Sequence, residues 1–293
     1  MLASLGAELL KVRRRPSTWV LPLIWLAIIV LLNYTLVYIL LSNVPPPTFP
    51  EGTPKAQQER VREQQEQFQR QQLRSLYPEN LVGSIIPGYP SLGAPIALIL
   101  GSLAVGSEYG WATFKTVLTQ RPGRTALFLG KLLALGVMLA LLVALTFATG
   151  AASSLVVAAL AGGPVKGPPP GELLRALGAG FLILSVWASL GALLSTLLRS
   201  TALSIGLGLV YSLVLETVIF NLPINSESFT NARRFFPGQN SSSLADSFST
   251  QPPTALAPPT PQIDATQSTL VLLAYTITFI ALATFIFNRR DVA

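Results

Sequence analysis

Residues 126–161 read ALFLGKLLALGVMLALLVALTFATGAASSLVVAALA, and Lys131 is the single charged side chain among them. A helix needs about 20 apolar residues to cross the hydrocarbon core of a bilayer. This segment is longer than a straight crossing requires, so we expect a membrane-spanning helix that either tilts or breaks near Gly150. Other long apolar stretches flank it. The sequence therefore predicts an all-α, polytopic membrane protein with six transmembrane helices.

The predicted spans follow one another within a single transmembrane domain, residues 1–293. The second span has three prolines in its first half, and only the polar turn Arg199–Thr201 separates the fourth span from the fifth. Signal peptides have apolar regions of about 7–15 residues, and the apolar run after Arg15 is longer, so we interpret the first span as retained. We place the six spans at residues 19–41, 84–105, 126–161, 173–198, 202–220 and 269–287.

The composition excludes several classes of protein. Charged residues make up 11% of the 293 residues, whereas soluble domains carry about 25%. Hydrophobic residues make up 51%, and the mean hydropathy is +0.54. The chain has no cysteine and no histidine. This excludes disulfides, thiolate nucleophiles and histidine-based chemistry, and we expect no metal site.

The positive charge is distributed unevenly about the predicted spans. The formal net charge is +7. With six spans both termini lie on one side, where we find the unbalanced basic residues Lys11, Arg13, Arg14, Arg15, Lys115, Arg121, Arg124, Lys131, Arg199, Arg289 and Arg290. Because loops rich in Lys and Arg stay in the cytoplasm, we expect a multi-pass protein of the cell membrane with both termini cytoplasmic. The sequence has no basic stripe interleaved with exposed aromatics, which is the pattern that would indicate nucleic-acid binding.

Residues 2–15 have the pattern of an amphipathic helix. Leu2, Leu5 and Leu9 fall at helical spacing, and Pro16 interrupts the pattern before the first span. We expect a helix in the inner headgroup layer, held by its leucines and by attraction of its basic residues to anionic membrane lipid. The alternative is a plain cytoplasmic extension of the first span.

Two long segments lie on the opposite side in this topology. The loop at residues 43–83 opens with three prolines and continues into a helix-forming stretch rich in Gln, Glu and Arg, residues 56–76. This outer helix either docks a partner or is simply solvated. The loop at residues 222–266 is rich in Pro, Ser and Thr, and its prolines between 252 and 261 predict extended or irregular backbone.

The connection at residues 106–124 is the most informative segment outside the spans. Gly110 should end the preceding helix, and Pro122-Gly123 should end the next one. Between them, apolar side chains recur at the spacing of one face of a short amphipathic helix: Trp111, Phe114, Val117 and Leu118. Such a helix either docks into a groove on a partner or packs on lipid alone.

The same segment resembles the signature of the permeases of type-2 ABC exporters. The residues that match are Glu108, Gly110, Thr113, Lys115, Leu118, Pro122, Arg124, Gly130 and Lys131. Ala112 stands where that family usually has glycine. The stretch Glu8–Lys11 is similar to the family's elbow helix, and Phe236-Pro237-Gly238 resembles the outer segment that precedes its last span.

The resemblance implies a permease subunit whose cytoplasmic coupling helix sits in a groove of a separate ABC ATPase subunit. The docking residues would be Trp111, Phe114, Val117 and Leu118. Glu108 would cap the helix N-terminus, where a carboxylate is favoured, and Arg121 and Arg124 would meet the ATPase or inner-leaflet phosphates. A second permease copy, identical or related, would complete the transporter.

No ATP hydrolysis is expected in this chain, so we expect it not to be an enzyme. A P-loop requires G-x-x-x-x-G-K-[ST]. The nearest match runs from Gly123 to Gly130-Lys131, has too many intervening residues, and continues with Leu132 where Ser or Thr must bind magnesium. We expect no cofactor in this chain, with ATP and Mg²⁺ bound by the partner ATPase.

Glu216 is the main candidate for a substrate pathway, since an acid inside a membrane span marks a functional site by default. The alternative is a structural acid, protonated or paired with a cation such as Arg175. Asn33 and Tyr34 in the first span are further pathway candidates, with interhelical hydrogen bonding as the alternative. Small residues at every fourth position of 93–101 and 136–148 predict close helix contacts, within the chain or with a second copy.

Other functions fit parts of this pattern. An ATPase-coupled assembly subunit that transports nothing would share every motif. An ion-driven secondary transporter should show internal repeats and ionisable groups near the midplane, and only Glu216 resembles the latter. A membrane-embedded enzyme needs clustered carboxylates or histidines, which the pattern does not offer. We expect an exporter permease, with the first two functions as alternatives; the sequence does not predict the substrate.

Overall fold

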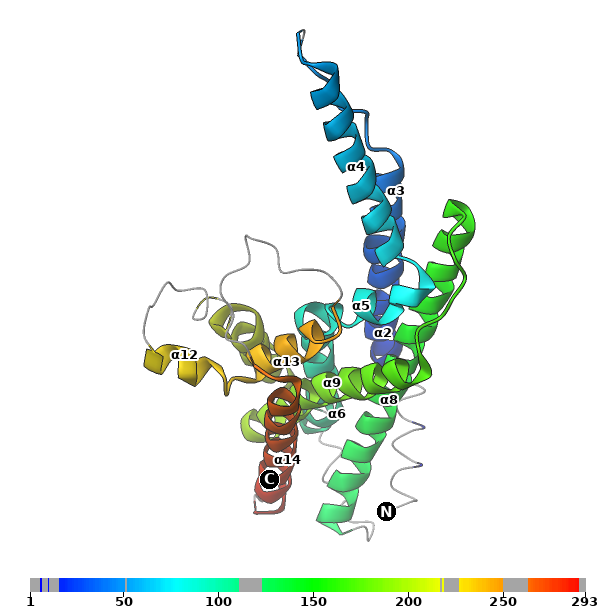
Figure 1. Cartoon of the computed structure of the whole chain (residues 1–293). Coiled ribbons are helices and arrows are strands. Elements are labelled where there is room, and N and C mark those ends of the chain that lie inside the picture. The colour runs from blue at the N-terminus through cyan, green and yellow to red at the C-terminus, as the bar shows by residue number, and fades with distance from the viewer. Residues whose placement is uncertain are drawn as a thin grey trace.

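The computed structural model describes residues 6, 10, 16–50, 52–110, 123–216, 218, 227–249 and 263–289. These residues form helices joined by short irregular segments, with no β-strand among them (Figure 1). The predicted all-α class is confirmed for this part of the chain. Five helices in it are long and apolar enough to cross a membrane, which is compatible with a multi-pass membrane protein: Thr18–Ser42, Tyr89–Tyr109, Thr125–Ala161, Pro170–Leu198 and Ala265–Arg289.

The first two crossings each contain a π-helical stretch. In the first, α2 (Pro16–Ile28), η1 (Ile29–Leu36) and α3 (Val37–Ser42) run on without a break, and η1 is the π-helical part. In the second, α5 (Leu81–Ile85) is followed by the π-helical η3 (Tyr89–Gly93) and by α6 (Ala94–Gly110). The prolines in this region lack a backbone N–H, which accounts for the interruption between α5 and η3.

The remaining elements complete the chain. They are α4 (Lys55–Ser75), the 3-10 turn η2 (Pro78–Asn80), α8 (Arg124–Ala161), α9 (Pro170–Leu198), α10 (Thr201–Leu209), η4 (Val210–Leu215), α12 (Glu227–Arg233), α13 (Pro237–Asp246) and α14 (Ala265–Arg289). α12 and α13 lie in the outer loop at 222–266, whose composition did not predict helix.

The fifth predicted span is shorter than expected. Within the described residues, α10 and the π-helical η4 form one apolar helix, Thr201–Leu215, that is too short to count as a crossing by itself. The count of six spans is therefore not confirmed. The predicted turn before this helix is present: Arg199 takes a left-handed conformation with φ 52°, and the Leu203 N–H donates to Oγ of Ser200 at 3.4 Å.

α8 is one uninterrupted helix, so of the two alternatives for this span the break near Gly150 is excluded. Gly150 instead permits close packing, because a Cβ at this position would overlap Cδ1 of Ile85 on α5. At 1.5 Å per residue α8 is about 57 Å long. A helix of this length fits a core of about 30 Å only by tilting or by extending beyond it.

The core is built around a close contact between α6 and α9. A Cβ at Gly101 would overlap the carbonyl oxygen of Ala188, and one at Gly191 would overlap that of Leu98. The first small-residue stripe therefore serves packing within the chain. The second stripe differs, since Ala140, Ala144 and Ala148 are exposed on α8.

The outer polar helix is present as predicted, and α4 projects beyond the rest of the bundle (Figure 1). On this helix Arg70 and Glu66 form an ion pair at 3.2 Å. Arg62 lies over the ring of Phe49, 5.7 Å from its centroid. Three predicted features fall outside the described residues: most of the helix at 2–15, the coupling helix at 111–122, and the proline-rich stretch at 252–261.

Candidate functional site

The C-terminal end of α14 packs against the beginning of α8, at the lower end of both helices in Figure 1. The Thr125 hydroxyl donates to Oδ1 of Asn288 at 3.3 Å. The rings of Phe128 and Phe287 stack with their centroids 4.7 Å apart and their planes 20° apart. The last helix of the chain therefore ends beside the residue at which the chain re-enters the bundle after the predicted coupling segment.

A buried ion pair joins the helices on either side of that segment. Nζ of Lys131 on α8 donates to Oε1 of Glu108 on α6 at 2.6 Å, and the side chains are 3% and 1% exposed. Both residues belong to the motif that resembles the exporter permeases. The sequence predicts only a capping role for Glu108. Its pairing with Lys131 could not be predicted, because the segment at 111–122 separates the two residues along the chain.

Apolar side chains from four helices form one cluster near the last described residues of α6 and the beginning of α8. Val105 of α6, Leu127 and Phe128 of α8, Ala192 and Leu193 of α9, and Ala283 and Phe287 of α14 are all buried in one cluster. We call this cluster and the Glu108–Lys131 pair the coupling frame. Since it connects both ends of the segment at 111–122 to two further helices, a force on that segment would reach all four helices together.

The predicted coupling residues divide into two groups. Gly110 lies at the end of the described part of α6, and Arg124 is the first residue of α8. The others lie outside the described residues: Trp111, Thr113, Phe114, Lys115, Val117, Leu118 and Arg121. The structure thus describes the two anchors of the coupling segment.

The turn between α9 and α10 lies at the same end of α6. Ser195 of α9 donates to the carbonyl of Ser102 at 3.1 Å, and its hydroxyl is 2.7 Å from that of Ser204 on α10. A Cβ at Gly106 would come within 2.6 Å of Oγ1 of Thr201. Arg199, in this turn, therefore belongs to the same end of the molecule as the coupling frame.

Glu216 lies against the N-terminus of α13. Its side chain is 5% exposed, and a Cβ at Gly238 would overlap its Oε2. The Tyr211 hydroxyl and the Gly238 N–H face the carboxylate, although neither carboxylate oxygen has a hydrogen bond of good geometry among the described residues. A helix N-terminus favours negative charge, so Glu216 helps to place the outer helix α13.

The pairing of Glu216 with Arg175 is wrong. Within the described part of the chain no ion pair joins them, and Arg175 instead lines a cavity between α9, α13 and α14. Glu216 therefore contacts a neighbouring element, as expected of a structural acid. The contact is with the backbone of α13 and not with a cation.

Asn33 and Tyr34 both lie in the π-helical η1 and bond to Ser84. Asn33 Nδ2 donates to the Ser84 carbonyl at 2.9 Å, and the Tyr34 and Ser84 hydroxyls are 3.2 Å apart. The hydrogen-bonding alternative therefore holds for both residues. Asn33 also lines two neighbouring cavities of about 360 and 300 Å³, whereas Tyr34 is fully buried.

π-Helical stretches accompany these candidate residues, and the sequence analysis did not foresee them. η1 contains Asn33 and Tyr34, and η4 precedes Glu216 directly. Such stretches are frequent at functional sites because they interrupt the regular helical hydrogen bonding. In the described residues no group of three or more acidic side chains is placed to hold a metal ion.

Comparison with known proteins gives one match. Residues 73–293 match the model of a family described as "Protein of unknown function (DUF2705)". The matched region includes α5 to α14 and both residues of the buried ion pair. No curated protein matches the chain. Because the match extends over most of its length, the chain belongs to the DUF2705 family.

Proposed function

We propose that this chain is the membrane-spanning permease subunit of an ATP-driven exporter of the type-2 ABC class. The observation that supports this most is the coupling frame, in which a buried ion pair of 2.6 Å closes the two ends of the segment at 111–122. The paired residues, Glu108 and Lys131, are two members of the motif that resembles those permeases. The segment between them is the coupling helix of the proposal.

The frame suits a helix that receives force from a partner. Breaking a buried ion pair leaves an uncompensated charge in a medium of low dielectric, so the ends of α6 and α8 should move as one body. Through Phe128 and Phe287 the same motion would reach α14. Nucleotide-driven closure of two ATPase subunits would push on the coupling helices of two permease copies and shift their spans.

In this proposal the chain lies in the cell membrane with six spans and both termini in the cytoplasm. Arg199, in the turn after α9, and Arg289, at the end of α14, lie near the same end as the coupling frame. Loops and ends rich in basic residues stay in the cytoplasm, which supports a cytoplasmic position for this end. The apolar helix Thr201–Leu215 would be the fifth span, completed by the residues that follow it.

The ATPase is a separate chain in this proposal, and it binds ATP and Mg²⁺. Purification of the tagged chain from its native membranes in mild detergent, followed by mass spectrometry, tests this directly. We expect a stoichiometric P-loop ATPase with hydrolytic activity. A preparation with no ATPase would contradict the proposal and favour an ion-driven transporter.

A double variant links the ATPase to the coupling segment. Trp111→Ala with Phe114→Ala should insert normally but lose the ATPase, because both aromatic side chains lie on the predicted docking face. The control is Phe68→Ala on α4, whose aromatic side chain is 60% exposed. In Figure 1, α4 projects at the end of the bundle opposite to the beginning of α8. Full retention of the ATPase by the double variant would contradict the docking assignment.

Transport separates an exporter from an assembly subunit. Reconstituted vesicles containing the permease and its ATPase should transport cargo when ATP is added. An imposed ion gradient in the absence of ATP should not drive this transport. ATP hydrolysis without cargo movement for any lipid, peptide or glycan pool of the native membrane would favour the assembly subunit.

A further inference from the structure

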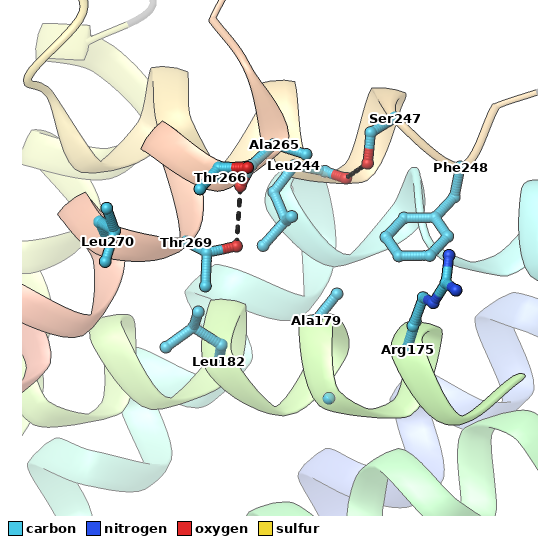
Figure 2. A pocket seen from close by; sticks show the side chains of 11 residues that line it. Arg175, Ala179, Leu182, Leu244, Ser247, Phe248, Ala265, Thr266, Thr269 and Leu270 are labelled. Carbon is cyan, nitrogen blue, oxygen red and sulfur yellow. Dashed lines mark hydrogen bonds between the residues drawn. The ribbon is translucent and has the colours of Figure 1, made fainter. Parts of the chain in front are cut away.

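A cavity of about 650 Å³ lies between α9, α13 and α14 (Figure 2). Sites for small molecules have volumes of about 300–1,000 Å³, so it could hold a sizeable ligand or part of one. Its walls are Arg175, Gly178, Ala179 and Leu182 of α9; Leu244, Ser247 and Phe248 at the end of α13; and Ala265, Thr266, Thr269 and Leu270 of α14.

The cavity is apolar except at one end. Two of its hydroxyl groups already donate to their own helices: Ser247 to the Leu244 carbonyl at 2.7 Å and Thr269 to the Ala265 carbonyl at 2.8 Å. Among the described residues that line it, Arg175 alone is charged, and Figure 2 shows the guanidinium directed toward Phe248. The cavity thus combines an apolar interior with a single positive charge.

The charge of Arg175 is not neutralised within the described part of the chain. No ion pair joins it to Glu172, one turn earlier on α9, or to any other described acid. Asp264 accepts a hydrogen bond from the first turn of α14, and Asp246 lines a different cavity. Residues 250–262, which connect α13 to α14, contain no acidic residue. The described residues therefore leave the Arg175 guanidinium available to an anion bound in the cavity.

The position of Arg175 along α9 matches the surface of a bilayer. α9 has 29 residues, a length of about 44 Å, and the hydrocarbon core is about 30 Å thick. The surplus at each end is about five residues, so Arg175, the sixth residue of α9, falls near the boundary with the headgroups. Ala179 and Leu182 then lie at the depth of the acyl chains.

The cavity also opens toward the lipid. Leu270 lines it and is 62% exposed, on a face of α14 that also presents the exposed Leu273 and Ile277. In a membrane helix such apolar exposure faces acyl chains. A lipid could therefore enter sideways, with its chain in the apolar part and its headgroup at the level of Arg175.

We propose that this cavity binds one anionic membrane phospholipid, with its phosphate on the Arg175 guanidinium and an acyl chain along Ala179, Leu182 and Leu244. Guanidinium and phosphate form charge-assisted hydrogen bonds. The apolar walls of the cavity would enclose the acyl chain of the lipid. The site does not depend on the proposed exporter function, because every group that forms it belongs to this chain.

Two variants test the two halves of the site. Arg175→Gln removes the charge, and Arg74→Gln on the exposed face of α4 is its control, with the same charge change. Gly178→Leu fills the apolar part without a clash, because no heavy atom lies within 4 Å of a Cβ built there. Gly206→Leu on α10 is its control, since the space around Gly206 is equally open.

Binding is measured on the delipidated full chain by native mass spectrometry during titration with phosphatidylglycerol or phosphatidylcholine of equal chain length. We expect the wild type to bind phosphatidylglycerol about tenfold more tightly, the size of effect that one charge-assisted contact gives. Arg175→Gln should remove this preference. Gly178→Leu should lower the affinity for both lipids by about tenfold, whereas the two controls should bind both lipids like the wild type.

Three results would overturn the proposal. Equal binding of the two lipids by the wild type would exclude selection by charge. Equal binding by Gly178→Leu and Gly206→Leu would place the lipid elsewhere, as expected if residues 250–262 fill the cavity. Displacement of the bound lipid by millimolar glycerol phosphate, with no requirement for an acyl chain, would indicate a soluble anion as the ligand.

Discussion

Two buried carboxylates, Glu108 and Glu216, are accommodated in different ways. Glu108 in the coupling frame faces a lysine at 2.6 Å, and the two side chains neutralise each other inside an apolar cluster. Glu216 faces no cation among the described residues; it lies against the backbone at the N-terminus of α13, where Gly238 leaves room for it. Both are almost completely buried.

The difference has mechanical consequences. A buried ion pair between two helices resists separation, because each charge would lose its partner in a medium of low dielectric. A carboxylate against a helix N-terminus gains less, typically about 0.3–2 kcal/mol, and can be neutralised by a proton. We therefore infer that the frame transmits force and that the contact of Glu216 with α13 can be released.

Removal of the lysine should have the largest effect. Lys131→Met retains the length of the side chain but withdraws the cation that faces Glu108, and we expect a loss of about 3–5 kcal/mol in the free energy of unfolding. Denaturant unfolding in detergent measures it. Glu108→Gln combined with Lys131→Met should recover most of the loss. A double variant as unstable as Lys131→Met alone would contradict the pairing.

A methyl group at Gly238 should have a smaller effect than the loss of the lysine. Gly238→Ala would overlap the Glu216 carboxylate, so either α13 or the glutamate must move, at a cost of about 1–3 kcal/mol. Thermal unfolding of the variant checks this, and Glu216→Ala in the same chain should relieve it. Gly136→Ala is the control, because nothing lies within 4 Å of its Cβ; equal destabilisation by both alanines would exclude the contact.

The two acids can also be compared by the same conservative change. Glu108→Gln should cost about 3–5 kcal/mol, since the buried charge of Lys131 loses its counter-charge. Glu216→Gln should cost less than about 1 kcal/mol, because no cation is left behind. In the complex with the ATPase, Glu216→Gln should change cargo-stimulated ATP hydrolysis more than it changes stability. Equal losses of stability for both variants would remove the distinction.

The exposed ion pair on α4 should have the smallest effect. Arg70 and Glu66 are 77% and 63% exposed, and pairs of this kind contribute about 0.2–0.5 kcal/mol. Arg70→Ala should therefore leave the unfolding transition almost unchanged. A loss comparable to that of Lys131→Met would show that α4 is packed against something in the assembled protein.

The long helices of this fold are predictable from composition and periodicity, and their interruptions are not. α4, α9 and α14 agree with their predictions within a few residues because apolar runs and helix-forming residues act locally. Gly150 misled the prediction, since its role is to admit Ile85 from another helix. The shortness of the helix Thr201–Leu215 and the π-helical stretches likewise depend on contacts that the local sequence does not contain.

The candidate site was predictable in its residues but not in its contacts. Glu108 and Lys131 stood out through a motif that resembles the signature of exporter permeases, yet their pairing requires α6 and α8 to lie side by side. Glu216 stood out as an acid in an apolar run, but its neighbour Gly238 is brought to it only by the outer loop. Arg175, named as one cation that could pair with Glu216, instead lines the cavity between α9, α13 and α14.

Site-specific crosslinking tests the central claim, coupling through residues 111–122, most directly. Because the chain has no cysteine, a single Phe114→Cys variant can carry a short thiol-reactive photocrosslinker in native membranes, with Phe68→Cys on α4 as the control. We predict a crosslink to a P-loop ATPase from position 114, altered by ATP, and none from position 68. A position 114 that crosslinks only to lipid, or an ATPase captured equally from both positions, would contradict the account.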